Sequence, residues 1–444
     1  MIQDRSGPGA VTEHDEKVER IARQLRERKG TQPVSLRKKA VSHVVPKFFD
    51  KKRSDDKIDV SDLDRILEID PVRRICVAEP GVTFVDLVDA TMKHGLVPII
   101  VPELKTITIG GAVAGCSIES MSFKYGGFHD TCREYEVITA NGDVRTCTPH
   151  GESSLLFQML HGTFGTLGII SKLTFDLIPA KKFVHVVYEK HRDLASYKAS
   201  IWRHFKDRDV DYVDGIIHSP ELYVLSVGRF VDEAPYRHSY DWMRIYWKST
   251  AARAEDYLRT PDYFFRYDKG VTNVHPSSFL GRLLFGKFVS SSEILALAEK
   301  LHWLLLPAER PPITLDVFIP FSRVEEFLGW YGREFKFYPL WMVPYRRVRD
   351  YEWIAPSVFE RCKDDELFLD LAIYGMEQPP DGRNYYRLIE EELLAIGGLK
   401  TLISHNHFTE DEFWSLWNRP NYEKAKAAAD PRGVFRGLYE KTCR

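Results

Sequence analysis

The 444-residue sequence lacks several features that would assign it to a class at once. Its first residues contain no apolar stretch of the kind that forms a signal peptide, and no run of about eighteen apolar residues predicts a membrane-spanning helix. The six cysteines form no CxxC pair, which argues against a zinc site or a disulfide framework and favours a reducing compartment. We therefore expect a cytoplasmic protein without a metal site.

The sequence also has little net charge. Its 62 Lys and Arg residues nearly balance 64 Asp and Glu residues, which leaves a net charge of −2. Such a chain has no global field that would attract nucleic acid, so no nucleic-acid partner is expected. A P-loop signature is absent, and the glycine spacing does not fit a dinucleotide fingerprint, which argues against a simple Rossmann site.

The distribution of predicted helices, predicted strands and aromatic residues divides the chain into four parts. Residues 1–32 are predicted to form an N-terminal helical extension, and residues 33–180 alternate short strands with short helices. Residues 181–420 have longer strands, amphipathic helices and many aromatic side chains, and residues 421–444 end in a helical segment. This pattern predicts an α+β fold and not a doubly wound βαβ repeat.

Local signals within the second part are clear. Thr83 is a plausible N-cap for an amphipathic helix that Gly95 ends, since Phe84, Leu87 and Val88 repeat at helical spacing. The segment 134–147 predicts a β-hairpin with Asn141-Gly142 at its turn.

Two glycine-rich stretches stand out, TIGGAVAGCSIES at 108–120 and GTFGTLG at 162–168. Glycine permits positive φ and lets a ligand approach backbone N–H groups, which suit a diphosphate. Either stretch alone is explained as well by tight turns. Together, with a hairpin between them, they favour a nucleotide site.

These stretches carry a resemblance to a known family. PELKTITIGGAVAGCSIESMSFKYGGFHD, EYEVITANGDV and GTFGTLGII resemble the FAD-binding domain of the vanillyl-alcohol-oxidase (VAO)/PCMH flavoproteins, and within that superfamily the Δ24-sterol reductase group. The resemblance continues through the segments 147–149, 178–184, 338–344, 371–375 and 411–414. It implies a two-lobed FAD-binding domain at 33–180 and an α+β cap, or substrate, domain at 181–420.

The resemblance also implies which residues contact FAD. We expect these to be Thr108, Ile109, Gly110, Gly111, Ala112, Gly115, Ser117, Ile118, Glu119, Ser120, Tyr125, Gly126, Asp130, Gly165, Gly168 and Ile169. The SGGHS-type loop that attaches FAD covalently in some superfamily members is absent, and His43 lies in that region without the glycines. Non-covalent FAD is therefore expected.

For function, the resemblance implies an NAD(P)H-fed reductase of an unactivated C=C bond in a lipid. A sterol side chain is the best-known case. Bacterial relatives of this group are thought to reduce a methylene branch on a fatty-acyl chain after a methyltransferase step, so functional pairing with a lipid methyltransferase is expected. An FAD-dependent oxidase or dehydrogenase of an alcohol, sugar or hydroxy acid is the alternative, and a relative that binds flavin without catalysis is a third.

The proton donor that such a reduction needs is left open by the sequence. Glu119, Tyr345, Tyr374 and His405 are the candidates, although each is explained as well by capping or packing. His405 and His407 have strand-like spacing but no matching third metal ligand. The apolar segment 277–289 predicts either a core helix or peripheral membrane contact.

Overall fold

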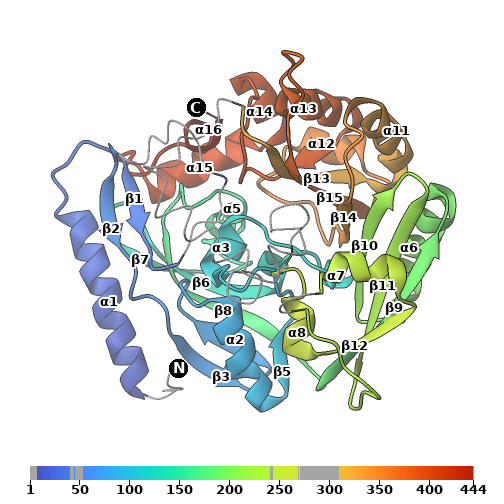
Figure 1. Cartoon of the computed structure of the whole chain (residues 1–444). Coiled ribbons are helices and arrows are strands. Elements are labelled where there is room, and N and C mark those ends of the chain that lie inside the picture. The colour runs from blue at the N-terminus through green and yellow to red at the C-terminus, as the bar shows by residue number, and fades with distance from the viewer. Residues whose placement is uncertain are drawn as a thin grey trace.

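The computed structural model describes residues 8–40, 45, 54–240, 244–268, 270 and 310–443. The segment 277–289 and His43 lie outside the described residues. Two large sheets organise the rest (Figure 1).

The first lobe is built on a six-stranded antiparallel sheet of order β3-β4-β8-β6-β7, with β5 paired to β8. Its strands are β3 (Ile66–Asp70), β4 (Ile75–Ala78), β5 (Leu96–Pro98), β6 (Cys132–Ile138), β7 (Val144–Cys147) and β8 (Ile169–Pro179). Its helices are α2 (Phe84–Thr91), α3 (Ile109–Ala114), α4 (Ser122–Tyr125) and α5 (Ser154–Met159), with 3-10 turns η2 (Met92–His94) and η3 (Phe128–Thr131).

The local sequence signals of this lobe are confirmed. Thr83 caps α2, since its Oγ1 accepts a hydrogen bond from the Asp86 N–H, and Gly95 ends the helical segment with a φ of 66°. Strands β6 and β7 form the expected hairpin, and Gly142 at its turn has a φ of 78°. In both turns glycine supplies the left-handed conformation that other residues adopt reluctantly.

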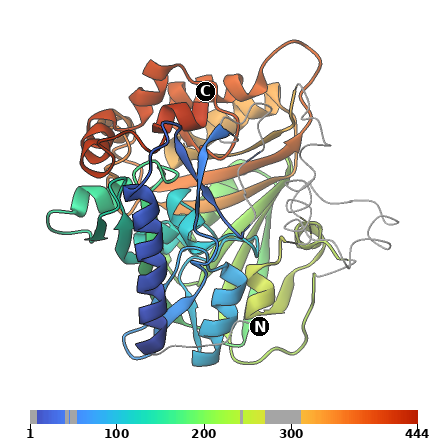
Figure 2. The same ribbon diagram turned by 90° about the vertical axis from the view of Figure 1, so that its left-hand side faces the viewer.

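Both ends of the described chain pack on the first lobe (Figures 1 and 2). The amphipathic helix α1 (Pro8–Arg26) buries Val18, Ile21 and Leu25 against Ile138 and Ile169 of the sheet. The remaining elements here are the parallel pair β1 (Val34–Arg37) and β2 (Asp56–Asp59) and the helices α15 (Arg419–Ala429) and α16 (Leu438–Cys443).

The second lobe is an eight-stranded sheet of order β12-β9-β11-β10-β14-β15-β13-β16. Its strands are β9 (Phe183–His191), β10 (Tyr212–Ser219), β11 (Leu222–Val231), β12 (Glu255–Arg259), β13 (Ile313–Pro320), β14 (Leu340–Arg346), β15 (Leu367–Met376) and β16 (Leu399–Lys400). Its helices are α6 (Leu194–Asp207), α7 (Tyr246–Ala252), α8 (Thr260–Phe264), α11 (Val324–Glu334), α12 (Pro356–Arg361), α13 (Tyr385–Ile396) and α14 (Glu410–Leu416), with the 3-10 turn η4 (Phe321–Arg323).

The two faces of this sheet have different roles. Side chains alternate between faces along a strand, so Leu315, Val317 and Ile319 of β13 face one way and pack with residues of α6, α11 and α13. The other face contributes Trp341 and Tyr345 to a core that it shares with the first lobe. A functional site between the lobes would therefore be built on this second face.

The observed mixture of helices and two sheets confirms the predicted α+β class. The change from one sheet to the other falls between β8 and β9, and the three boundaries between the four predicted parts stay predictions. Within the described part of the chain, none of the helices combines the length and the apolar character that a bilayer crossing requires.

Candidate functional site

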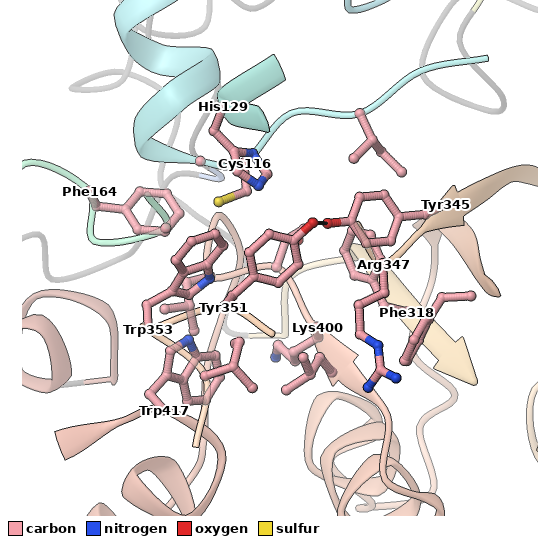
Figure 3. A pocket seen from close by; sticks show the side chains of 18 of the residues that line it. Cys116, His129, Phe164, Phe318, Tyr345, Arg347, Tyr351, Trp353, Lys400 and Trp417 are labelled. Carbon is pink, nitrogen blue, oxygen red and sulfur yellow. Dashed lines mark hydrogen bonds between the residues drawn. The ribbon is translucent and has the colours of Figure 1, made fainter. Parts of the chain in front are cut away.

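A pocket opens where the two lobes meet (Figure 3). It encloses about 800 Å³ of empty space, including the solvent at its mouth. The first lobe contributes Gly115, Cys116, Ile118, His129, Gly162 and Phe164. The C-terminal half of the chain contributes Phe318, Tyr345, Arg347, Tyr351, Trp353, Ile354, Phe359, Phe368, Leu399, Lys400, Thr401, Leu402 and Trp417.

Aromatic side chains form much of the wall. Figure 3 shows Trp353 and Tyr351 between the first lobe above and the second lobe below, and their rings lie 4.4 Å apart between centroids at an interplanar angle of 32°. Phe164 and Trp417 lie on the same side. Such a wall suits a flat ring or a greasy chain and excludes water.

Two basic side chains also line the pocket. Lys400 is fully buried, pairs with Glu390 at 2.7 Å and donates to the carbonyl of His405 at 2.7 Å. Burial lowers the pKa of Lys400, and Glu390 opposes this shift. Arg347 donates to the carbonyl of Lys363 at 3.1 Å.

The first glycine stretch surrounds the short helix α3. The N–H of Gly111 donates to Thr108 Oγ1, which caps the helix, and the N–H of Gly110 donates to the Pro80 carbonyl at 2.9 Å. A Cβ on Gly110 would lie 2.5 Å from Pro80 Cβ, so close packing requires this glycine. A Cβ on Gly111 would meet only Thr108 Oγ1, at 3.2 Å, so its outer side is open to a ligand. Gly115 follows one turn later and lines the pocket.

The second glycine stretch also contains glycines that face the pocket or open space and one that packs tightly. Gly162 lines the pocket with a φ of 64°, and a Cβ there would lie 3.3 Å from Trp353 Nε1. Gly165 has a φ of 69° and open space beside it. Gly168 instead packs tightly, because a Cβ would lie 2.9 Å from Val137 Cγ1. Ile169 is buried in β8 against α1.

Buried polar atoms without partners lie next to the pocket. His129 Nδ1 and Arg349 Nε have no hydrogen-bond partner among the described residues, whereas His129 Nε2 lies 3.2 Å from Asp130 Oδ2 and Arg349 Nη2 lies 3.0 Å from Asp130 Oδ1. His129 lines the pocket, and burial lowers its pKa and so favours the neutral ring. These unmet donors and acceptors beside an aromatic slot fit a polar heterocycle such as the flavin ring, so the residues present fit FAD.

The other residues that the resemblance assigned to FAD lie in several environments. Ile118 lines the pocket, as Gly115 does. The side chains of Ile109, Ala112 and Ser120 are fully buried in protein, which leaves only their backbone for a ligand. Tyr125 is 39% exposed.

Of the remaining three, Ser117 precedes α4, Gly126 follows it and Asp130 lies within η3. The carbonyl of Ser117 accepts a hydrogen bond from the Phe128 N–H, and a Cβ on Gly126 would lie 2.4 Å from Asp130 Oδ2. Asp130 lies beside the pocket, where its Oδ2 accepts a hydrogen bond from Tyr351 Oη at 2.9 Å.

Of the four candidate proton donors, Tyr345 lies on the pocket wall. Its hydroxyl is hydrogen-bonded to that of Tyr351. Tyr374 donates to Asp316 Oδ1 at 2.6 Å, and the ring of His405 packs 5.2 Å from that of Tyr386. No cluster of His, Cys, Asp and Glu suited to a metal ion occurs among the described residues.

Glu119, the fourth candidate, is held in a buried ion cluster. Arg266 lies 3.0 Å from Glu119 Oε1 and 3.1 Å from Asp214 Oδ2. The rings of Tyr263 and Tyr267 lie 4.1 Å and 4.8 Å from the guanidinium. Burial raises the pKa of Glu119, and Arg266 opposes this shift. The cluster ties the first lobe to the second.

Several pocket residues were missed by sequence reasoning. Trp353, Trp417 and Lys400 come from segments with no motif, and they reach the pocket through tertiary structure alone. His129 lay within the resembling segment, in GGFHD, and its two polar nitrogens were the signal that could have identified it.

Comparisons with known proteins agree with this site. An FAD binding domain model matches residues 12–148. The chain is 26% identical to a human Delta(24)-sterol reductase over 466 residues, which covers 97% of this chain and 86% of the relative. It is 25% identical to the pea (Pisum sativum) enzyme of the same name over 476 residues, which covers 97% and 84%.

A third relative has a higher sequence identity to this chain than the two sterol reductases, and this identity is high enough to assign the family. The decaprenylphosphoryl-beta-D-ribose oxidase of Mycolicibacterium smegmatis is 37% identical over 411 residues, which covers 85% of this chain and 82% of the relative. The similarity spans both lobes and the pocket between them, and it confirms the VAO/PCMH-type FAD-binding domain that the glycine stretches implied. The chain therefore belongs to the VAO/PCMH family of FAD-dependent oxidoreductases.

Proposed function

We propose that this protein is an NAD(P)H-dependent reductase of an unactivated C=C bond in a lipid, with a methylene-branched fatty-acyl chain preferred over a sterol side chain as substrate. The observation that carries the proposal is the extent of the similarity to the sterol reductases. It covers 97% of the chain and so includes the second lobe, whose residues form most of the pocket wall. The aromatic lining fits an uncharged, greasy substrate.

Bound FAD would supply hydride transfer once it has been reduced by NAD(P)H. The chain's own residues have three tasks in such a reaction. Gly111, Gly115 and Gly165 leave room for the cofactor, and the aromatic wall of Tyr351 and Trp353 excludes water. Because an isolated alkene gains positive charge when it is protonated, the faces of these rings also stabilise the developing cation.

The proton must come from a side chain near the pocket. Among the donors that the sequence offered, Tyr345 is best placed by its position on the wall. Burial raises the pKa of Tyr345 well above that of an ordinary phenol, which makes it a weak acid. An acid stronger than a phenol would protonate an alkene more readily.

A second function is favoured by the 37% identity to the decaprenylphosphoryl-beta-D-ribose oxidase. In that case the flavin would accept hydride from an alcohol on a lipid-linked sugar. The pocket supports this alternative through Arg347, whose positive charge suits a phosphate better than a hydrocarbon.

An anaerobic titration with NADPH, followed by visible absorption, separates the two functions. Prompt bleaching of the flavin band, followed by recovery of the band when a methylene-branched phospholipid is added, supports the reductase. A band that persists with NADPH but bleaches with a lipid-linked alcohol supports the oxidase. A colourless protein would contradict FAD binding itself. A cytoplasmic location, membrane contact through 277–289 and pairing with a lipid methyltransferase stay predictions.

A further inference from the structure

Three carboxyl groups from the two lobes converge on the pocket side of the eight-stranded sheet. Asp370 of β15 pairs across the ladder with Phe318 of β13, and Asp316 lies two residues before Phe318. Residues directly opposite each other, and residues two apart on a strand, project from the same face. Phe318 lines the pocket, so both aspartates lie on the face that the pocket is built on. Glu103, from the loop before α3, is close enough for its charge to act on both.

These three residues (Glu103, Asp316 and Asp370) form an acid cluster in which Asp316 accepts hydrogen bonds and one carboxyl oxygen of Asp370 does not. Asp316 accepts from Tyr374 at 2.6 Å and from the hydroxyl of Thr401, a pocket residue, at 3.4 Å. Asp370 is only 3% exposed, and its Oδ1 has no hydrogen-bond partner among the described residues. An unpaired carboxyl oxygen in such a position is costly and indicates a ligand.

Arg266 acts on the acid cluster only through its charge, which lowers the pKa of Glu103 against the larger effects of burial and of Glu119. Within the described part of the chain, none of the cluster's three members forms an ion pair. Arg266 is held by Glu119 and Asp214, and Lys400 is held by Glu390. The phenols of Tyr374 on β15 and Tyr345 on β14 are the other titratable groups on this part of the face.

Buried carboxyls that form no ion pair retain protons. Burial, together with Asp316 and Glu103, raises the pKa of Asp370 well above its usual value. Burial likewise raises the pKa of Glu103 to about 8 and that of Asp316 to about 6. The acid cluster therefore holds at least one proton at neutral pH as a carboxylic acid, and a carboxylic acid is a stronger donor than a phenol.

We propose that Asp370 is the acid that protonates the substrate alkene, while Asp316, Tyr374 and Glu103 keep its proton in place. This inference rests on the proposed reductase function. In the step, the O–H bond of Asp370 breaks, and the π electron pair of the alkene forms a new C–H bond with that proton. Bound FAD, once reduced by NAD(P)H, would supply the hydride that the adjacent carbon needs. The carboxylate left on Asp370 then regains a proton from water.

The test compares Asp370→Asn, Asp370→Glu and Tyr345→Phe with the wild-type flavoprotein. All four proteins are reduced anaerobically with NADPH, and a phospholipid with a methylene-branched acyl chain is then added. We expect Asp370→Asn to bleach at the wild-type rate but to be reoxidised by the lipid at least about 100-fold more slowly, because a general acid contributes on the order of 10²–10⁴-fold. Asp370→Glu, which keeps the acid, should recover part of the rate.

A second readout does not need turnover. Infrared spectra of the apoprotein labelled with ¹³C-aspartate should show a protonated carboxyl band at neutral pH that Asp370→Asn lacks. If Asp370→Asn folds poorly, Asp370→Glu gives the same readout. The labelled band should disappear in this variant, and an unlabelled carboxylic acid band should replace it.

Three results would overturn the assignment. The first is an active wild-type enzyme whose Asp370→Asn variant turns over within about threefold of it, and the second is loss of turnover in Tyr345→Phe alone. Absence of the band would also overturn it. If instead the wild-type protein is reduced by NADPH but never reoxidised by the lipid, the proposed reduction fails, and the role of Asp370 as its acid fails with it.

Discussion

Replacing Gly111 with Val should remove FAD while leaving the protein folded. A Cβ at this position meets only Thr108 Oγ1, at 3.2 Å, and the rest of its surroundings are open. Valine is also no worse than glycine inside a helix, so the free energy of unfolding of the apoprotein should change by less than about 1 kcal/mol. The valine methyl groups would occupy the space that we assign to the FAD diphosphate. We therefore expect at least about 100-fold weaker flavin binding, or about 2.7 kcal/mol.

Two other glycine substitutions serve as controls. A Cβ on Gly110 would lie 2.5 Å from Pro80 Cβ and 3.0 Å from the Pro80 carbonyl oxygen, so Gly110→Ala should lower the free energy of unfolding by about 1–3 kcal/mol. Gly437 has nothing within 4 Å of its added Cβ, so Gly437→Ala should preserve both stability and flavin. The assay measures released flavin per protein by absorbance and stability by urea denaturation. If Gly111→Val purifies with the wild-type amount of flavin, the assignment of this loop to FAD is wrong.

Two further predictions concern the buried charges. Arg266→Met leaves Glu119 and Asp214 without their cation, so the free energy of unfolding should fall by about 3–5 kcal/mol, and adding Glu119→Gln should recover part of it. Urea denaturation measures this, and an unchanged midpoint would contradict the role of the cluster. Because burial raises the folded-state pKa of Asp316 to about 6, its contribution to stability is present below the unfolded pKa and is lost as the pH rises through 6. Asp316→Asn should remove a decline on the order of 3 kcal/mol between about pH 4 and 6, and an unaltered pH–stability curve would refute this.

The sequence predicted those parts of the fold whose signals are local. The cap at Thr83 and the turn at Asn141-Gly142 each act within a few residues, and the structure has both. The glycine stretches likewise identified the FAD-binding domain. The sequence could not show that Gly110 packs tightly while Gly111 faces open space. The tight packing of Gly110 is against Pro80, which is distant in the chain.

The pocket was harder to predict for the same physical reason. Cys116 and His129 meet Trp353 and Trp417 only after the two sheets have packed together, and no spacing within the sequence encodes that contact. Asp370 was missed as well, since a single aspartate in the apolar run LFLDLAIYG carries no motif. Its unpaired carboxyl becomes visible only when the face of the sheet is known.

The pocket face of the eight-stranded sheet carries two groups of buried acids. They differ in whether a cation pairs with them, and this difference bears on function. In one group, Asp214 and Glu119 share Arg266, so folding alone explains why the charges are tolerated. In the other, Asp316 and Asp370 form no ion pair with any described residue, and an apolar pair would be more stable there. Groups that weaken a fold are kept where chemistry needs them. The second group lies beside the pocket-lining Phe318, where a lipid alkene would need its acid.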